Sequence, residues 1–584
     1  MKMALEHFQA GRMERAIDTL RALLRRDPAD DAAQLLLGCA LFETRQDQPA
    51  AYALRQALAA NPNDAQRWVH LGRVLQRLEG PASAAKVLEQ ALAGPPGKSK
   101  GAAQILLILA QCYEADQRLS DAIASCRRAV EIDPNLGPGL AQLGSTLFHA
   151  GQIDEAIEAM RRGVQSNPGD IRRRASFCFY LNYSDKVPPG EVFQAHRELG
   201  EAARRLMPPP QAPPKAPGAS QRPLRVGLVS GDFRQHSVRY FLPALLDHLD
   251  PKAFQIILLS TSRQRDAHTD ALRAKAAGWV DAIELDFAGF GQTVRKAKLD
   301  IALDLGGLTD SGRVLAFASR LAPLQATYLG YCNTTGVPNV DVRLVDEITD
   351  PPGADRFATE RLVRLPRCFV CYSPDPGAPA PAMPPPATPP TFLSFNNSNK
   401  LSPSCLALWS RVLQNVPGSR LRLKSAPFAD PSVRAAILNA FATHGVHSSR
   451  VDLLPRTHTV EDHLALYASG HVALDTTPYA GTTTTCEAMW MGVPVVSLRG
   501  DVHASRVGAS LLHAAGHSEW IAGTPDEFVA LAASLVADPH QLSHLRHHLR
   551  DELTRSPLCD ARDFAARFTQ TLRQCWNDPL PPRD

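Results

Sequence analysis

Residues 475–494 read DTTPYAGTTTTCEAMWMGVP, immediately after the apolar stretch 471–474. The pattern predicts a strand that ends at Asp475, a loop that turns at Pro478 and Gly481, and a short helix that stops at Gly492. The threonines 482–485 then lie at the helix N-terminus, where hydroxyls, unpaired backbone N–H groups and the positive dipole end can hold a diphosphate without a metal. The plainer alternative is that these threonines only cap the helix.

The same half of the chain alternates strands with helices. We expect strands at 391–395, 421–424, 471–475 and 493–498, and a helix over 405–416, which together indicate a parallel, doubly wound sheet. Lys400 follows the first of these strands in the sequence FNNSNK. Because both loops end strands of one sheet, Lys400 can converge with the threonines on one phosphate pair. Without the threonine loop, a solvated lysine would be the simpler interpretation.

The preceding segment predicts a second sheet of the same kind. Strands are expected at 224–230, 254–260 and 300–305, and helices such as 269–277 separate them. Two such sheets in series offer a cleft between their strand carboxyl ends. His236 lies in the loop after the first strand, on the cleft side. A histidine bonded to nearby backbone is an equally good interpretation of that position.

Two proline-rich stretches divide the chain. Residues 208–217 form one, and residues 374–390 contain nine prolines in seventeen positions. Proline lacks the backbone donor and fixes φ, so both stretches predict extended linkers. The predicted divisions are repeats at 1–170, connecting helices with a proline-rich linker at 171–222, a first α/β half at 223–373, the second linker at 374–390, and a second α/β half at 391–584.

The first 170 residues repeat. Alanines 16, 50, 84, 122 and 156 are spaced by 34, 34, 38 and 34 residues, and each is followed twelve residues later by a proline. Together with the element Trp68-Val69-His70-Leu71-Gly72, this period is similar to the tetratricopeptide repeat. A generic alanine-rich bundle does not explain it. We therefore predict an α-solenoid of about five repeats, whose concave surface receives peptides or partner proteins.

Composition excludes several classes of protein. Apolar runs fall well short of the about 18 residues needed to cross a bilayer, which argues against a membrane protein. The N-terminal residues lack a secretory signal, so we expect a cytoplasmic protein. A formal charge of +4 gives no reason to expect nucleic acid as a partner, and eleven scattered cysteines predict free thiols.

The order of these features resembles the O-GlcNAc transferase family, and within it the bacterial homologues from xanthomonads. The shared motifs are D-F-x-x-H-S ending at Ser237, Leu329-Gly330-Tyr331, Ser394-Phe395-Asn396-Asn397 with Lys400, the threonine loop, and His503-Ala504-Ser505-Arg506-Val507-Gly508. The resemblance implies two Rossmann-like halves in the GT-B arrangement. It also implies inverting, metal-independent transfer of GlcNAc from UDP-GlcNAc to Ser or Thr of acceptor proteins, with no cofactor.

The resemblance assigns roles to matching residues. His236 and Lys400 are expected to be catalytic, His236 as general base or positioning group. Diphosphate and nucleotide contacts are expected from Asn397, Lys400, His458, His463, Thr482, Thr483, Thr484 and Glu487, and a sugar pocket from Gly330, Tyr331 and Tyr479. Such chemistry needs a proton acceptor for the hydroxyl and cationic or dipolar groups for the departing diphosphate.

The chain departs from the animal members at several positions. Where they line the solenoid with asparagines, this chain has Leu36, His70, Ile108 and Gln142, and Val460 replaces a lysine near the uridine. Thr482 replaces a histidine and is similar to the plant SPINDLY O-fucosyltransferases. Two alternatives therefore remain: a GDP-fucose-dependent O-fucosyltransferase, and a catalytically silent scaffold that binds nucleotide.

Two other clusters predict no site. Cys368 and Cys371 have C-x2-C spacing but no second pair, and among His544, His547 and His548 two imidazoles stand at i and i+4 with no evident third ligand, so we expect a solvated helix face there.

Overall fold

The computed structural model describes residues 1–209, 222–283, 285–309, 312–385 and 388–578. The chain forms two compact units. The first contains residues 1–167 with the short segment 429–435, and the second contains residues 168–428 and 436–584. Most of the predicted linker 208–217 lies outside the described residues.

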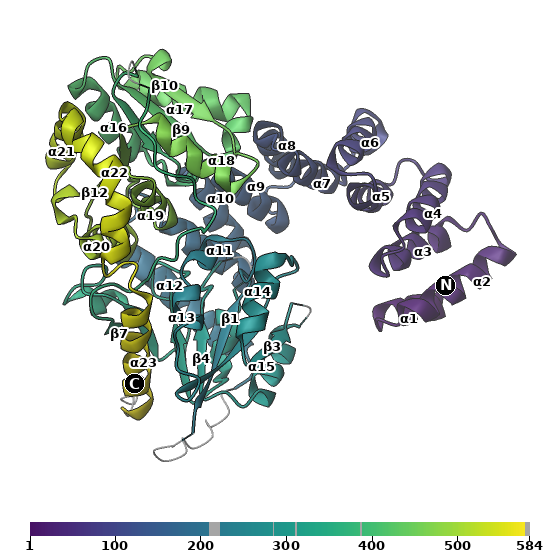
Figure 1. The fold of residues 1–584 in the computed structure, drawn as a ribbon. Helices are drawn as coiled ribbons and strands as arrows, with labels where there is room; N and C mark the ends of the chain where they lie inside the picture. Colours follow the sequence, from purple (N-terminus) through teal and green to yellow (C-terminus); the bar gives the residue numbers. More distant parts are fainter. Residues whose placement is uncertain (210–221, 284, 310–311, 386–387, 579–584) are drawn as a thin grey trace. The chain divides into compact units, whose positions relative to one another are not determined.

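The first unit is a solenoid of five antiparallel helix pairs (Figure 1). In chain order the helices are α1 (Lys2–Gln9), α2 (Met13–Arg26), α3 (Asp31–Glu43), α4 (Asp47–Ala60), α5 (Ala65–Leu78), α6 (Pro81–Ala93), α7 (Ala102–Ala115), α8 (Leu119–Ile132), α9 (Gly137–His149) and α10 (Ile153–Ser166). This arrangement confirms the predicted α-solenoid.

Small residues explain the phase of the repeat. The five alanines that mark it are fully buried in the second helix of each pair. A Cβ on Gly38 would lie 2.5 Å from Cγ of Leu54, so glycine lets α3 and α4 pack closely. The longer 38-residue interval arises because a 3-10 turn, η1 (Pro95–Lys98), is inserted between α6 and α7.

Helices α11 (Ile171–Leu181) and α12 (Pro189–Leu206) begin the second unit and pack on its first sheet. Cys178 and Leu199 lie in the same apolar core as Phe290 of that half. A Cβ on Gly200 of α12 would lie 1.7 Å from the carbonyl oxygen of Gly336. The close approach fixes α12 against the loop that follows the fifth strand.

The first sheet is entirely parallel, with strand order β3-β2-β1-β4-β5-β6-β7. Its strands are β1 (Leu224–Ser230), β2 (Phe254–Ser260), β3 (Gly278–Asp281), β4 (Ile301–Asp304), β5 (Leu324–Thr327), β6 (Val342–Val345) and β7 (Arg361–Arg364). Its helices are α13 (Pro243–Leu246), α14 (Ala267–Lys275) and α15 (Phe287–Lys296), with 3-10 turns η2 (Ser237–Tyr240), η3 (Val314–Ser319) and η4 (Ala354–Phe357).

The second sheet is also parallel, with order β10-β9-β8-β11-β12-β13. Its strands are β8 (Thr391–Ser394), β9 (Arg420–Lys424), β10 (Val451–Leu454), β11 (Val472–Leu474), β12 (Val495–Leu498) and β13 (Ile521–Ala522). Its helices are α16 (Pro403–Asn415), α17 (Pro431–Thr443), α18 (Val460–Ala465), α19 (Thr483–Trp490), α20 (Val507–Ala515), α21 (Pro525–Ala537) and α22 (Pro539–Arg555), with 3-10 turns η5 (Ser398–Lys400), η6 (Ala426–Ala429), η7 (Ser448–Arg450), η8 (Leu466–Ser469), η9 (His503–Ser505) and η10 (Ser518–Trp520). Two doubly wound halves are thus confirmed.

Helix α23 (Ala561–Asn577) follows the second half but packs on the first (Figure 1). The ring of Phe568 lies 5.4 Å from that of Tyr328, and the Arg573 guanidinium lies 5.6 Å from the ring of Phe254. A part of the segment 391–584 therefore covers the first sheet.

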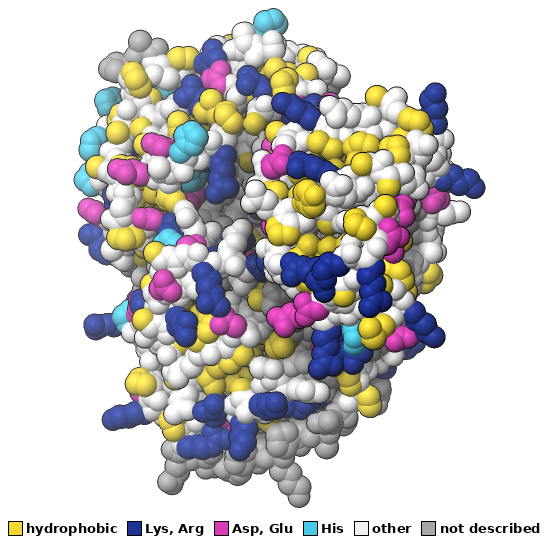
Figure 2. Space-filling model, turned by 90° about the vertical axis from the view of Figure 1, so that its right-hand side faces the viewer, with side chains coloured by type: hydrophobic (Ala, Val, Ile, Leu, Met, Phe, Trp, Pro, Cys, Tyr) yellow, Lys and Arg dark blue, Asp and Glu magenta, His cyan; other side chains and the backbone are white. Residues whose placement is uncertain are grey.

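The described part of the stretch 374–390 contains no helix or strand, as its prolines predict. All eleven cysteines are free, which confirms the predicted thiols. On the face drawn in Figure 2, Lys and Arg side chains are interspersed with Asp and Glu. The mixture agrees with the small net charge of +4.

Candidate functional site

The strand orders define one switch point in each sheet. Strand order reverses between β1 and β4 in the first sheet and between β8 and β11 in the second. Ligands of open α/β sheets bind at the carboxyl ends of such strands. The loops that begin there carry His236 after β1, Lys400 after β8, and the threonines after β11.

The carboxylate of Asp475 organises the loop after β11. It accepts hydrogen bonds from the backbone N–H of Thr476 (2.9 Å) and Gly481 (2.6 Å) and from the hydroxyl of Ser497 (2.7 Å). Burial raises the pKa of Asp475, against these hydrogen bonds. The buried carboxylate folds the loop back so that α19 begins at the edge of the sheet.

The N-terminus of α19 is open to a ligand. Thr482 stands at the N-cap position but makes no side-chain capping hydrogen bond, which argues against the simple capping alternative. Thr482, Thr483 and Thr484 are half-buried. A Cβ on Gly481 would lie 2.6 Å from the hydroxyl oxygen of Thr484, so only glycine fits there. The first backbone N–H groups of α19 and the hydroxyls of Thr482 and Thr483 thus lie together at the helix N-terminus, beyond the carboxyl end of β11.

Lys400 reaches this same loop. Its Nζ donates a 2.8 Å hydrogen bond to the carbonyl oxygen of Ala480 and lies 4.4 Å from the centre of the Tyr479 ring. Burial lowers the pKa of Lys400 to about 8, and the nearby charge of Asp475 opposes that shift. Asn397, three residues earlier, is exposed. The two loops that the sequence predicted to converge therefore do so at Lys400.

A second polar group lies beside α19, at Glu487 in its second turn. Nε2 of His463 lies 2.9 Å from Glu487, and Nζ of Lys424 lies 2.6 Å from Nδ1 of His463. If Lys424 donates to Nδ1, the ring proton sits on Nε2 and is donated to Glu487. Burial lowers the pKa of Lys424 to about 8. His458 is exposed in the loop between β10 and α18.

His236 lies at the carboxyl end of β1, with 39% of its side chain exposed. Its Nδ1 accepts a long hydrogen bond from the backbone N–H of Val238 (3.4 Å) and lies 3.7 Å from the Asp232 carboxylate. Burial lowers the pKa of His236, while the carboxylate of Asp232 opposes that shift. The ring therefore favours its neutral form at pH 7.

The residues expected in a sugar pocket have different surroundings. Tyr479 stacks on Tyr183 with ring centres 4.5 Å apart. The buried Tyr331 directs its hydroxyl to Asn182 (3.1 Å) and His196 (2.7 Å) of the helical segment 171–206. Its hydroxyl is thus already engaged by protein. For Gly330, an added Cβ would lie 2.0 Å from the carbonyl oxygen of Leu305, so the backbone needs glycine.

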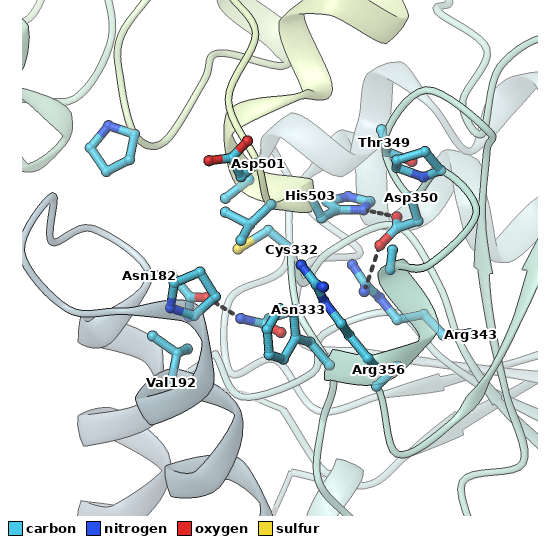
Figure 3. A pocket seen from close by; sticks show the side chains of 18 of the residues that line it. Asn182, Val192, Cys332, Asn333, Arg343, Thr349, Asp350, Arg356, Asp501 and His503 are labelled. Carbon is cyan, nitrogen blue, oxygen red and sulfur yellow. Dashed lines mark hydrogen bonds and ion pairs between the residues drawn. The ribbon is translucent and has the colours of Figure 1, made fainter.

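The motif 503–508 joins the two α/β halves. Nδ1 of His503 lies 2.5 Å from Asp350, which in turn lies 3.6 Å from Nη1 of Arg343 on β6. Burial raises the pKa of Asp350, but the charges of His503 and Arg343 more than offset this and hold it well below its ordinary value. Figure 3 shows these contacts on the wall of a pocket of about 240 Å³, into which Asn333 and Arg356 also project.

Sequence reasoning missed Lys424, Tyr183 and the Asp350 network. Lys424 ends β9 at the same sheet edge, so the rule that found Lys400 could have found it. No local pattern marks Tyr183. Among the described residues, no group of three or more His, Cys, Asp or Glu is arranged to hold a metal ion, and no helix is long and apolar enough to cross a membrane.

Comparison with known families adds to this geometry. The model of glycosyl transferase family 41 matches residues 204–373 and 385–568. Tetratricopeptide repeat models match residues 1–65, 70–136 and 138–170. The matches follow the order solenoid, first half, second half.

Individual proteins of the same kind are also similar to the chain. The chain is 38% identical over 426 residues to the probable UDP-N-acetylglucosamine-peptide N-acetylglucosaminyltransferase SPINDLY of Oryza sativa subsp. japonica. The match covers 72% of this chain and 46% of that protein. The protein of the same name from Arabidopsis thaliana is 39% identical over 402 residues, and the match covers 68% of this chain and 44% of that protein. The chain thus spans less than half the length of these relatives. A solved O-GlcNAc transferase mutant of Thermobaculum terrenum matches with a TM-score of 0.79 and 32% identity, covering 88% of this chain and 97% of that one.

Proposed function

Because the chain belongs to glycosyl transferase family 41, we propose that it is a protein O-glycosyltransferase that moves GlcNAc from UDP-GlcNAc to serine or threonine of other proteins. The observation that carries this proposal is the convergence of Lys400 with the open N-terminus of α19 at the switch point of the second sheet. A cation and a helix N-terminus together suit a departing nucleoside diphosphate.

The transfer step is an inverting displacement. The acceptor hydroxyl attacks the anomeric carbon, and the bond from that carbon to the β-phosphate oxygen breaks. The electron pair leaves with UDP, whose charge is balanced by Lys400 and by the N–H groups of α19. Lys400 and the α19 N-terminus supply the counter-charge, and we propose that no metal or other cofactor is needed. We assign Asn397, Thr482, Thr483 and Thr484 to the same diphosphate site.

His236 receives or directs the proton of the acceptor hydroxyl. With Nδ1 turned to the Asp232 carboxylate as a donor, Nε2 is free to accept that proton. With Nδ1 accepting from Val238, Nε2 instead carries hydrogen and can orient an oxygen. The lowered pKa of His236 favours a neutral ring in both cases.

The base of the nucleotide is assigned to the group Lys424, His463 and Glu487, with His458 nearby in sequence. His463 packs 5.8 Å from Phe395 and is held on both ring nitrogens, so it can present a fixed surface to a base or ribose. The sugar is assigned to the surroundings of Gly330, Tyr331 and Tyr479. Their part is to pack around it, because Gly330 lies close to the backbone, the Tyr331 hydroxyl is bound by His196, and Tyr479 stacks on Tyr183.

The solenoid is proposed to present acceptor proteins, and the enzyme is proposed to act in the cytoplasm, without nucleic acid or membrane partners. The tetratricopeptide matches support a protein-binding role. For the donor, the names of the SPINDLY relatives and of the Thermobaculum terrenum O-GlcNAc transferase favour UDP-GlcNAc. Thr482 keeps GDP-fucose as the second candidate.

Calorimetric titration of UDP and GDP into the purified chain, paired with transfer from UDP-GlcNAc and GDP-fucose to a protein acceptor, tests the proposal. We expect UDP to bind more tightly and GlcNAc to be transferred. Tighter binding of GDP together with transfer of fucose would show that GDP-fucose is the donor. Nucleotide binding without any transfer would instead identify a silent scaffold.

A further inference from the structure

The pocket drawn in Figure 3 is separate from the residues assigned to the transfer reaction. It has a volume of about 240 Å³ and is lined by α11, α12 and the loops that follow β5, β6, β11 and β12. None of the described residues assigned to the donor, the sugar or the acceptor hydroxyl lines it. We call it the Arg343 pocket and define it by its charged and titratable residues, Arg343, Asp350, Arg356, Asp501 and His503.

Arg343 is a buried cation with too few partners. Only 4% of its surface is exposed. Among the described residues no acceptor lies within hydrogen-bonding distance of its Nη2, and its ion pair with Asp350 joins Nη1 at 3.6 Å. Asp350 is itself held by Nδ1 of His503 at 2.5 Å. Because a buried guanidinium without acceptors is costly, the pocket must supply one, from water or from a ligand.

Arg356 brings a second guanidinium to the same pocket. It belongs to η4, in the loop between β6 and β7, and projects into the cavity (Figure 3). Its guanidinium lies 4.8 Å from the ring of Phe357, and the neighbouring carboxylate, Asp355, pairs with Arg364 instead (2.8 Å). Two guanidiniums that face one cavity suit the two oxygens of a carboxylate.

Much of the remaining wall is apolar. The larger apolar side chains of the wall are Leu181, Val187, Val192, Phe357, Pro478 and Val502. A hydrated inorganic anion would leave this surface in contact with water, whereas a hydrocarbon body covers it. A cavity of about 150 Å³ holds benzene, so about 240 Å³ suits a short hydrocarbon body that carries a carboxylate.

The two carboxylates of the Arg343 pocket do not satisfy Nη2 of Arg343. Asp350 is engaged by His503 and reaches only Nη1 of Arg343. Asp501 is exposed, so water and salt screen its charge. The free donor of Arg343 is therefore left for an acceptor that enters from outside.

We propose that the Arg343 pocket binds a small carboxylic acid with an apolar body, as a ligand distinct from the sugar donor and the acceptor protein. The carboxylate is bound by Arg343 and Arg356, and the body lies against the apolar wall. Pro478 of that wall precedes Tyr479, whose ring centre lies 4.4 Å from Nζ of Lys400. The ligand therefore contacts the loop that positions Lys400.

Three probes that share parts of this chemistry test the proposal. Isocaproate carries both a carboxylate and a branched hydrocarbon, isocaproamide keeps the shape without the charge, and acetate keeps the charge without the body. Ligand-observed NMR titration of the full chain measures the three dissociation constants. We expect isocaproate to bind at least about tenfold more tightly than either of the other two.

Variants of the two arginines locate the carboxylate. In R343Q the ratio of the isocaproamide to the isocaproate dissociation constant should fall below about twofold, and R356Q should weaken isocaproate binding at least about threefold. R499Q is the control, because Arg499 is an exposed arginine two residues before Asp501 that does not line the pocket. It should bind isocaproate as the wild type does.

A third variant fills the pocket. Ala358 is half-buried on the wall, and A358F adds a ring there without removing a polar group, so it should abolish isocaproate binding. Thermal unfolding checks that each variant is folded. R343Q also takes a cation from Asp350, and if it does not fold, R356Q and A358F decide the question.

Equal affinity of the wild type for isocaproate and isocaproamide, or no binding of either, would show that water alone satisfies Arg343 and overturns the proposal. Isocaproate binding that persists in A358F places the acid elsewhere and overturns it as well. Acetate that binds as tightly as isocaproate contradicts the apolar body. Every readout is binding, so the result does not depend on the proposed transferase function.

Discussion

The hydroxyl of Thr484 donates a 2.8 Å hydrogen bond to Oδ1 of Asn396 and so joins the first turn of α19 to the loop after β8. This hydrogen bond holds the loop that carries the threonines at a fixed position relative to the loop that carries Lys400. The spacing between helix N-terminus and lysine is set by a side-chain contact, in addition to the sheet itself.

Removing that contact should loosen the diphosphate site. We expect T484V to weaken UDP binding about tenfold, because Asn396 is left with a buried, unpaired oxygen worth ~1–2 kcal/mol. Calorimetric titration measures the loss. T484S keeps the hydroxyl and should bind nearly as the wild type does; UDP binding by T484V at wild-type strength would show that this hydrogen bond does not shape the site.

Replacement of Lys400 should affect turnover more than folding. We expect K400A to lower kcat about a hundredfold, since loss of one charged contact to a departing anion costs ~3 kcal/mol. Circular dichroism and thermal unfolding check that the fold is intact. A folded K400A variant with a near-normal rate contradicts the assignment of Lys400.

The lowered pKa of Lys400 predicts that activity falls at alkaline pH. Lys400 has a pKa of about 8 and is charged below that value, so kcat/KM should fall as the pH rises through about 8. A bound diphosphate favours the charged form, and the corresponding limb in kcat should therefore lie at higher pH. K400R, if it retains measurable activity, should lose the alkaline limb, because arginine stays protonated throughout. An unchanged limb in K400R would assign it to another group.

His236 should matter for transfer and little for the nucleotide. It comes from the first half, and the groups assigned to UDP come from the second, so we expect H236A to lower transfer at least a hundredfold while UDP affinity stays within about twofold. Parallel titration and rate measurements separate the two effects. Equal losses in affinity and rate would place His236 at the nucleotide instead.

The contact between His503 and Asp350 should stabilise the joined halves. Removing the imidazole leaves the buried carboxylate of Asp350 with a 3.6 Å contact to Arg343, so we expect H503A to lose about 3 kcal/mol in the free energy of unfolding. Denaturant unfolding measures this. H513A is the control, because His513 is an exposed histidine on α20.

The effect of Asp350 should depend on pH in one direction. Its folded pKa lies below the value of an unfolded aspartate, so its contribution is complete above about pH 5 and is lost progressively as the pH falls further. The difference in stability between wild type and D350N should therefore shrink in acid. A difference that is constant down to pH 3 would show that packing, not charge, accounts for it.

Removing residues 1–170 should separate binding from presentation. Lys400, α19 and His463 all belong to the second unit, so nucleotide binding should persist, whereas transfer to protein acceptors should fall at least tenfold. Transfer to a short peptide is the matched control. Unchanged transfer to proteins would show that the repeats do not present acceptors.

Much of this organisation could be predicted because it depends on local rules. The spacing of Ala16, Ala50 and Ala84 is set by helix pairing, and each of these alanines is fully buried. The convergence of Lys400 with the threonine loop follows from the rule that parallel strands share a carboxyl edge. Both features follow from patterns that can be seen along the sequence: a repeat period, and polar residues that directly follow predicted strands.

What could not be predicted depends on contacts between distant segments. Tyr331 was expected in a sugar pocket, yet its hydroxyl is bound by Asn182 and His196, about 140 residues earlier. Nothing in α11 or α12 marks them as its partners. Likewise, Asp350 and His503 are 153 positions apart, and only the packing of the two halves brings them to 2.5 Å.

The return of α23 to the first sheet has a consequence for biosynthesis. A ribosome completes both sheets before it makes Phe568, and until then the first half lacks the helix that lies against Tyr328 and Phe254. Domains generally fold as they emerge during translation. Here the first half must wait, with an apolar face uncovered, until the second has been synthesised, which makes nascent chains halted between 391 and 560 natural clients for chaperones.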